Sequence, residues 1–288
     1  MSFTNRKITV SFNMQNGNFA GGGNNATLSG LRISAHIINA GGASMGQLQM
    51  AIFGMELSMM NQLSTVGKQI NYISKNQITV QAGDDINGMS TVFIGNISYA
   101  WVDAKSQPNV CFRVEAIAGG DLAVKAAPPT SVQGAGDVAT IMGQIAQANG
   151  LTFENNGVNV KIANPYLAGS VRNQILSLAK HAGIEHVIDK GTLAVWNPGQ
   201  SRKGSTPVIS SATGMVGYPA FNQAAVIVES IFKPTFQPGG KITIKSDLTP
   251  ACGDWTIFHI DHELESEIPH GKWFTILSAS PIQGSDTP

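Results

Sequence analysis

The sequence predicts a mainly β protein that carries an α+β insert in the middle of the chain. Residues 206–279 alternate short runs of Val, Ile, Phe and Trp with Gly and Pro, which is typical of antiparallel strands joined by turns. The first 120 residues alternate apolar and polar positions in the same way. Between these regions the apolar residues instead follow helical spacing. We therefore expect three modules, in residues 1–120, 121–205 and 206–288.

The first module is expected to be an antiparallel β unit with one short helix. Residues 7–12 and 31–37 alternate as half-buried strands do, and residues 56–63 carry apolar residues three positions apart, as a helix does. The Gly-rich segment 21–25 leads into a strand, whereas a phosphate-binding loop leads into a helix, so we expect a hairpin tip. The other expected strands are residues 50–53, 78–80, 91–101 and 110–116.

The middle module contains an internal repeat. Residues 136–165 and 169–198 are both thirty residues long and align without a gap. Each copy begins with an amphipathic helix and continues into two short apolar runs separated by an Asn-Gly or a Lys-Gly pair. We therefore expect two αββ units, with hairpins over residues 151–162 and 184–195.

Caps and linkers delimit this module. Ser170 is placed to cap the second helix, and Gly150 and Gly183 are placed to end the two helices in the left-handed conformation. Pro128-Pro129 before the module and residues 199–204 after it are expected to be linkers. Because the repeat can close its own core, we expect a separable module. The expected protease-sensitive segments are residues 127–133 and 200–205.

Composition limits the classes of function. Only 12% of the residues are charged, about half the usual share, and the formal net charge is zero. Such a chain has no long-range field that attracts nucleic acid or acidic membranes, and little repulsion that keeps copies apart. No apolar run approaches the ~20 residues of a membrane helix, and we expect no secretion signal. The two unclustered cysteines, Cys111 and Cys252, are expected to be buried and reduced, as after folding in cytosol.

The densest group of chemically capable side chains lies near residue 260. On a strand, alternation places four of them on one face: His259, Asp261, Glu263 and Glu265. It places Phe258, Ile260, His262 and Leu264 on the other. A metal site or a general acid–base pair uses these residue types, but a polar strand face opposite an apolar one explains the pattern without either. We therefore expect no metal, no cofactor and no catalytic residue. The adjacent acids Asp84 and Asp85 are expected to favour a turn.

The C-terminal module also carries a set of ordered motif residues: Gly214, Gly217, Tyr218, Pro219, Phe221, Pro234, Pro238, Gly239 and Trp273. Their order and spacing resemble the C-terminal part of bacteriophage baseplate hub proteins of the late-control protein D type, which are related to the hub part of type VI secretion spikes. No single tripeptide is specific, whereas the order across residues 206–279 is.

The resemblance implies a structural protein of a phage tail and not an enzyme. It implies a homotrimer in which each chain supplies two similar, β-barrel-like tube modules, residues 1–120 and 206–288, so that six surround the axis. This ring would join the hexameric tail tube to the three-fold spike and form part of the DNA channel. Expected partners are other copies of the chain, the tube protein, the spike protein, other baseplate proteins and, as a further candidate, the tape measure protein.

The implied location is the virion, after synthesis in the host bacterial cytoplasm, with DNA present only in transit. Under this interpretation the face formed by His259, Asp261, Glu263 and Glu265 either lines the channel or lies in an interface. Two alternatives stay open. One is the hub of a tailocin or a secretion machine, and the other is a tail-associated hydrolase or metal-binding enzyme that uses this face.

Overall fold

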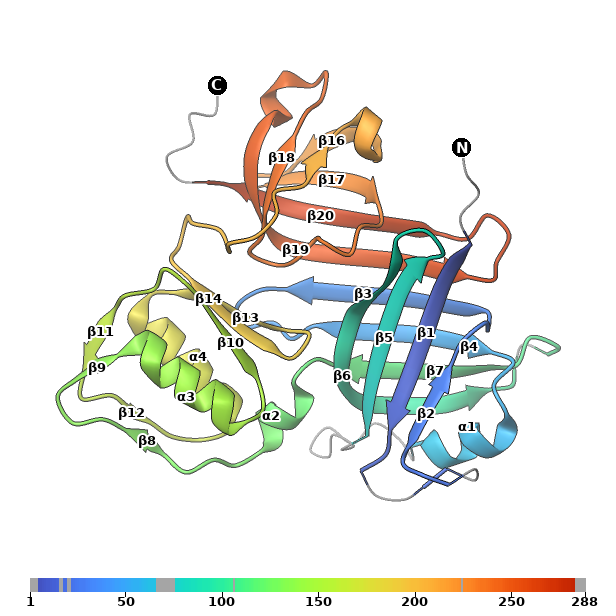
Figure 1. Cartoon of the computed structure of the whole chain (residues 1–288), viewed down its shortest axis with the longest axis horizontal. Helices are drawn as coiled ribbons and strands as arrows, with labels where there is room; N and C mark the ends of the chain where they lie inside the picture. The colour runs from blue at the N-terminus through green and yellow to red at the C-terminus, as the bar shows by residue number, and fades with distance from the viewer. Residues whose placement is uncertain are drawn as a thin grey trace. The chain divides into compact units, whose positions relative to one another are not determined.

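The computed structural model describes residues 5–15, 18–19, 22–65, 76–105, 107–223 and 225–282. Strands predominate in this part of the chain, and most belong to one large, mainly antiparallel sheet (Figure 1). This confirms the mainly β class. The chain divides into two compact units, which are described separately. Unit 1 comprises Met1–Ile38, Gly46–Asp121 and Asp261–Phe274, and unit 2 comprises Asn39–Met45, Leu122–Ile260 and Thr275–Pro288.

Unit 1 is built from strands with one seven-residue helix. Its elements are β1 (Arg6–Asn13), β2 (Asn25–Leu28), β3 (Ile33–Ala40), β4 (Gln47–Phe53), α1 (Leu57–Leu63), β5 (Gln77–Asp84), β6 (Gly88–Asp103), β7 (Cys111–Ile117) and the start of α2 (Gly120–Val124). The strand order is β2-β1-β5-β6-β7-β4-β3. The C-terminal part of β19 (Gly253–Ser266) and the start of β20 (Trp273–Pro281) also belong to this unit. Every second side chain of β1, β3 and β4 is buried, as the period-two pattern predicts.

Two turns of unit 1 bear on the expectations. The carboxylate of Asp84 accepts hydrogen bonds from the backbone N–H groups of Ile86 and Asn87, which confirms that this acid supports the β5–β6 turn. Hydrogen bonds from the Asn87 side chain, and then these backbone bonds, hold the pKa of Asp84 below its usual value. β1 and β2 pair as an antiparallel hairpin, as expected for the Gly-rich tip, although residue 21 lies outside the described residues.

Unit 2 contains the α+β region. Its elements are β8 (Thr130–Ser131), β9 (Ala135–Asp137), α3 (Val138–Ala148), β10 (Thr152–Asn156), β11 (Lys161–Ala163), β12 (Tyr166–Leu167), α4 (Val171–Ala182), β13 (Glu185–Asp189) and β14 (Thr192–Trp196). The helices end as expected. Ser170 accepts a hydrogen bond from the Asn173 N–H, and Gly150 and Gly183 have φ of 72° and 63°.

The prediction of a hairpin over residues 151–162 is wrong. β13 and β14 form an antiparallel hairpin that turns at Lys190-Gly191, as expected. In the first copy β10 instead pairs in parallel with β14, and β11 pairs with β9. β14 is almost fully buried, so it needs a hydrogen-bonded neighbour on both edges, and β10 supplies the second one.

The rest of unit 2 is a β region. It comprises β15 (Val208–Ile209), β16 (Met215–Phe221), β17 (Val226–Ile231), β18 (Lys241–Ile244), the N-terminal part of β19 and most of β20. The strand order is β16-β17-β20-β19, and β18 pairs with both β19 and β15. Among the described strands, β2 pairs only with β1 and β16 only with β17, so neither unit closes into a barrel on its own. The barrel-like character expected of the modules is thus not a property of the single chain.

Among the described residues, unit 2 has two large hydrophobic cores, apart from a small cluster of Val187, Ala194 and Trp196. One comprises buried residues between Leu122 and Val195, from the helices and short strands, and we call it the α+β core. The other comprises buried residues between Ile209 and Ala279, and we call it the β core. Both cysteines are free, with Cys111 buried and Cys252 partly buried. No helix in the described ranges is both long and apolar enough to span a membrane.

Candidate channel-lining or interface surface

The acidic segment of β19 lies on a half-buried face of the sheet in unit 1. From Ile260 onward, burial alternates strictly along the strand. The buried positions are Ile260, His262, Leu264 and Ser266. The half-buried positions between them are Asp261, Glu263 and Glu265. Three carboxylates therefore point to the same side of unit 1, as expected, while the fourth expected member, His259, is half-buried in unit 2.

The expected position of Phe258 is wrong. Its side chain is 44% exposed, whereas Ile260 is buried. Ile257 and Ile260 both belong to the β core although one has an odd and the other an even number. The core-facing positions of the strand therefore shift by one residue between Ile257 and Ile260, so strict alternation does not hold across that point.

Each of the three carboxylates has a polar neighbour in unit 1. The Nε2 atom of His36 lies 2.6 Å from Oδ1 of Asp261, and neither atom has a hydrogen-bond partner among the described residues. This close approach lacks hydrogen-bond geometry, and it is an attractive ion pair only when His36 is protonated. Lys272 forms an ion pair of 2.7 Å with Glu263, and its backbone N–H donates to Glu265 at 2.8 Å. The acidic segment is thus partly neutralised.

Cross-strand registry extends this face over four further strands. Tyr99, Glu115, Gln49 and His36 lie side by side on β6, β7, β4 and β3. The next row contains Trp101, Arg113, Ala51 and Ser34, and the Ser34 hydroxyl donates to Glu265. Tyr99 and Trp101 stack with ring centroids 4.4 Å apart. A recess of about 340 Å³ lies over these rows. We call this surface, with Glu115, Asp261, Glu263 and Glu265 as its carboxylates, the acidic face.

The charged side chains of the acidic face are mostly engaged in pairs. Within the described residues, no group of three or more His, Cys, Asp and Glu side chains is placed to hold a metal ion. Arg113 is already paired with Asp103 at 2.7 Å, which holds the pKa of that carboxyl below its usual value. The arrangement can present negative charge and aromatic surface to a partner or to solvent.

The motif residues of the C-terminal region have mainly backbone and packing roles. Gly214, Gly217 and Gly239 have positive φ values of 104°, 67° and 77°, which favour glycine. Tyr218 and Phe221 are 71% and 48% exposed on the edge strand β16. The remaining four differ in burial: Pro219, Pro238 and Trp273 are buried, whereas Pro234 is exposed. The carbonyl of Pro238 accepts a hydrogen bond in the polar cluster described next.

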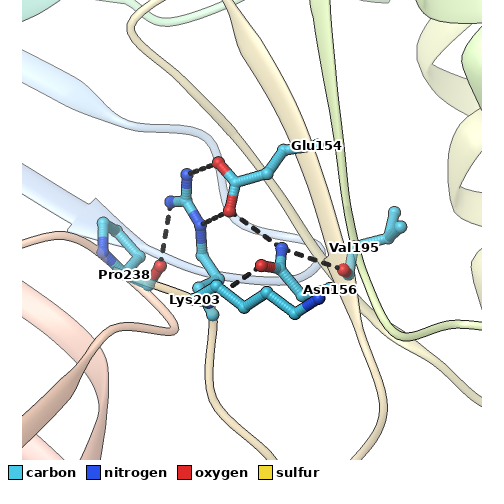
Figure 2. Close-up of polar contacts among 6 residues, drawn as sticks. Glu154, Asn156, Val195, Lys203 and Pro238 are labelled. Atoms are coloured by element: carbon cyan, nitrogen blue, oxygen red, sulfur yellow. Dashed lines mark hydrogen bonds and ion pairs between the residues drawn. The ribbon is translucent and has the colours of Figure 1, made fainter. Parts of the chain in front are cut away.

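A buried polar cluster in unit 2 escaped sequence analysis. Arg202 donates to both carboxylate oxygens of Glu154, at 3.1 and 2.6 Å, and to the carbonyl of Pro238 at 3.1 Å (Figure 2). Asn156 donates to Glu154 and to the carbonyl of Val195. The guanidinium holds the pKa of Glu154 below its usual value. The sequence signal is faint, because Arg202 lies in a Gly- and Ser-rich segment that is typical of a linker.

His36, Glu115 and Tyr99 were also missed on the acidic face. His36 occupies a polar position of an alternating strand, so its face could have been predicted, but its neighbour across the sheet could not. Strand order decides which residues meet, and the sheet places β4 beside β7 and β3 beside β19, strands that are far apart in the sequence.

Comparison with known proteins supports a single family. Residues 7–277 match the family model described as baseplate hub gp41. No curated protein matches the chain at a significant level. A tail protein from Neisseria meningitidis has a similar structure, with a TM-score of 0.64 and 11% identity over 96% of each chain. The 43 kDa tail protein of prophage MuSo2 from Shewanella oneidensis has a TM-score of 0.61 and 11% identity, over 96% of this chain and 99% of that one.

A third similar structure comes from a secretion system. An Escherichia coli component of the type VI secretion system, described as structurally similar to the T4 bacteriophage tail proteins gp27 and gp5, has a TM-score of 0.59 and 10% identity, over 87% of this chain and 73% of that one. At such identities the three structures show a shared fold. The family model covers nearly the whole chain and agrees with the resemblance carried by residues 206–279. The chain therefore belongs to the baseplate hub gp41 family of phage tail structural proteins.

Proposed function

We propose that the chain forms a homotrimeric hub in which the β regions of three copies surround a channel, between a hexameric tail tube above and a three-fold spike below. The observation that carries this proposal is the combination of the family match with open sheet edges in both units. An exposed edge invites uncontrolled pairing unless a neighbour covers it. A ring of copies would cover these edges and supply the barrel-like closure that the single chain lacks. The location that follows is the virion.

The oligomeric state tests this proposal directly. Purified chain, alone and mixed with the tube and spike proteins of the same particle, is analysed by sedimentation velocity and native mass spectrometry. We expect three copies per complex. A chain that stays monomeric or dimeric inside an assembled tail contradicts the proposal.

We further propose that the acidic face lines the channel as a surface that does not retain DNA. A basic wall binds DNA by releasing its counterions, whereas a wall of carboxylates does not. Asp261 and Glu263 are half-buried in the single chain, and both remain able to face solvent on the side opposite the buried positions. His259 is assigned to the same lining.

The double variant D261K/E263K separates a channel wall from an interface. We expect particles that assemble normally but eject DNA at least tenfold more slowly, measured by release of dye-accessible DNA after triggering. The matched control is D247K/E56K, which makes the same change of net charge at two exposed positions outside the acidic face. If D261K/E263K blocks assembly while the control assembles, these residues lie in a subunit interface and the channel proposal is wrong.

The hub of a secretion machine is the second candidate. The similarity to the Escherichia coli secretion component favours it, because that chain shares the fold over most of this one. The two candidates use the same trimer, and the difference lies in whether DNA or protein passes through the channel. The ejection assay therefore distinguishes them as well.

A further inference from the structure

The two large cores of unit 2 have no buried residue in common among the described residues. The buried residues of the α+β core all lie between Leu122 and Val195, and those of the β core between Ile209 and Ala279. The partly buried apolar side chains that pack on each core also come from its own part of the chain. Two bodies with separate cores are free to move relative to one another unless something else joins them.

The junction contains a cavity. A space of about 260 Å³ lies between the two parts, lined among others by Gly41, Trp196, Gly239 and Thr256. The hydroxyl of Thr256 is buried and has no hydrogen-bond partner among the described residues. Interiors of single domains are close-packed, so the junction is less tightly packed at this recess than a domain interior.

Polar contacts of Arg202 cross the junction instead. Its side chain is 5% exposed, and its guanidinium bonds Glu154 of β10 on one side and the Pro238 carbonyl on the other (Figure 2). Its backbone N–H donates to the carbonyl of Gly239 at 2.7 Å. A side chain at position 239 would place its Cβ 2.7 Å from the Trp196 ring, so glycine permits this approach. One residue thus binds both parts through side chain and backbone.

We propose that Arg202 and Glu154 form a clasp that holds the α+β core against the 237–240 turn, and that opening this clasp loosens this junction while both cores stay folded. Replacing both partners of a buried ion pair costs little net stability, whereas removing one partner can leave a buried charge unpaired. Here that charge is Arg202, because its side chain is 5% exposed and the Glu154 side chain is 33% exposed. Such a pair therefore specifies one arrangement more than it stabilises the fold. The clasp adds a hinge within the subunit and does not depend on the hub proposal.

Cleavage after Lys203 reports the state of the clasp. Lys203 is exposed and follows Arg202, and its backbone N–H is held by Asn156 at 2.8 Å. Endoproteinase Lys-C is applied to the full chain, to R202M and to E154Q, with peptide mapping by mass spectrometry. The control variant R113M breaks an arginine–carboxylate pair inside unit 1. Cleavage after Lys180, an exposed residue of α4, is the internal standard for the α+β core.

We expect cleavage after Lys203 to rise at least tenfold in R202M and about threefold in E154Q, with R113M unchanged and Lys180 unchanged in every variant. No increase after Lys203 overturns the clasp. An equal increase after Lys180 also overturns it, because the α+β core then unfolds together with the junction. If R202M is recovered unfolded, cleavage of E154Q after Lys203 serves as the test, because this variant keeps the size of the side chain and one of the two acceptor oxygens.

Discussion

The two thirty-residue copies in unit 2 have the same spacing but different pairing. The second copy folds its two strands into a hairpin, with φ of 49° at Lys190 and 77° at Gly191. A gapless alignment places Gly157 and Val158 at these positions in the first copy. A two-residue turn of this kind needs positive φ at both central residues, which a β-branched residue resists. The comparison shows that a turn residue displaced by one position redirects a whole strand.

The loop of the first copy closes on itself instead. Asn155 both donates to the carbonyl of Val158 and accepts from its N–H. β10 is then free to pair with β14 of the second copy. The two copies thereby share one sheet, in which the second copy supplies the central strand and the first supplies an edge.

The largest expected difference between the copies concerns the aligned residues Leu193 and Val160. Leu193 is fully buried in the α+β core, and Val160 is only partly buried against it. We expect L193A to lower the free energy of unfolding by about 2–5 kcal/mol and V160A by about 1 kcal/mol. Native-state hydrogen exchange of α4 amides measures both. Equal losses would show that the two aligned positions contribute equally to the core.

His186 should make the stability of the chain depend on pH, whereas its aligned residue Phe153 should not. Burial, with a smaller contribution from Arg172, lowers the pKa of His186 to about 4. The unfolded chain binds a proton near pH 6.5 and the folded chain does not, so stability is full above that pH and falls as the pH drops to about 4. The loss over this window is about 3 kcal/mol.

The variant H186F removes this proton-linked loss, and H181Q at an exposed histidine of α4 is the control. Urea unfolding at pH 7 and pH 5 measures the difference between each variant and the parent chain. Taking this difference also cancels the contribution of Asp189 to the pH dependence of stability. Burial raises the pKa of Asp189, so its contribution changes with pH in the opposite direction. A pH dependence in H186F equal to that of the parent contradicts the assignment.

The smallest expected difference concerns the helix caps. The Asp137 carboxylate accepts from both the N–H and the hydroxyl of Thr140, at 2.8 and 2.6 Å, whereas Ser170 accepts one bond of 3.3 Å. We expect D137A to cost about 1–2 kcal/mol and S170A about 0.5–1 kcal/mol. Hydrogen exchange of the first-turn amides of α3 and α4 measures each loss.

Of the two caps, only Asp137 should contribute a stabilisation that depends on pH. Its hydrogen bonds from Thr140 lower the pKa of Asp137. The stabilisation is therefore present above the unfolded value near 3.9 and is lost as the pH falls through the lower folded value. A serine cap carries no charge, so S170A should cost the same at pH 3 and pH 6. If the costs of D137A and S170A changed by the same amount between pH 3 and pH 6, this assignment would be wrong.

The division into three modules, with boundaries near residues 120 and 205, stays a prediction. The two expected linkers differ in the structure, because residues 128–129 are exposed whereas Arg202 is buried within the second linker. Gly, Ser and Pro content indicates where a chain lacks regular structure, but not whether a side chain in that segment is held by a distant residue. We now expect proteases to cut residues 127–133 before residues 200–205.

Local pattern by itself determined the class of fold, most strands, the helix ends at Ser170 and Gly183 and the hairpin at Lys190-Gly191, because each depends on residues close together in the chain. The family came from a resemblance that rests on the order of motif residues across residues 206–279. Only the tertiary structure decided that β10 joins β14, that His36 meets Asp261, and that Arg202 reaches Glu154. These contacts join residues from 40 to more than 200 positions apart, and strand order and burial select them from many pairings that the same pattern allows. Alternation assigns a side chain to a face, whereas the neighbour on that face depends on how the whole sheet is assembled.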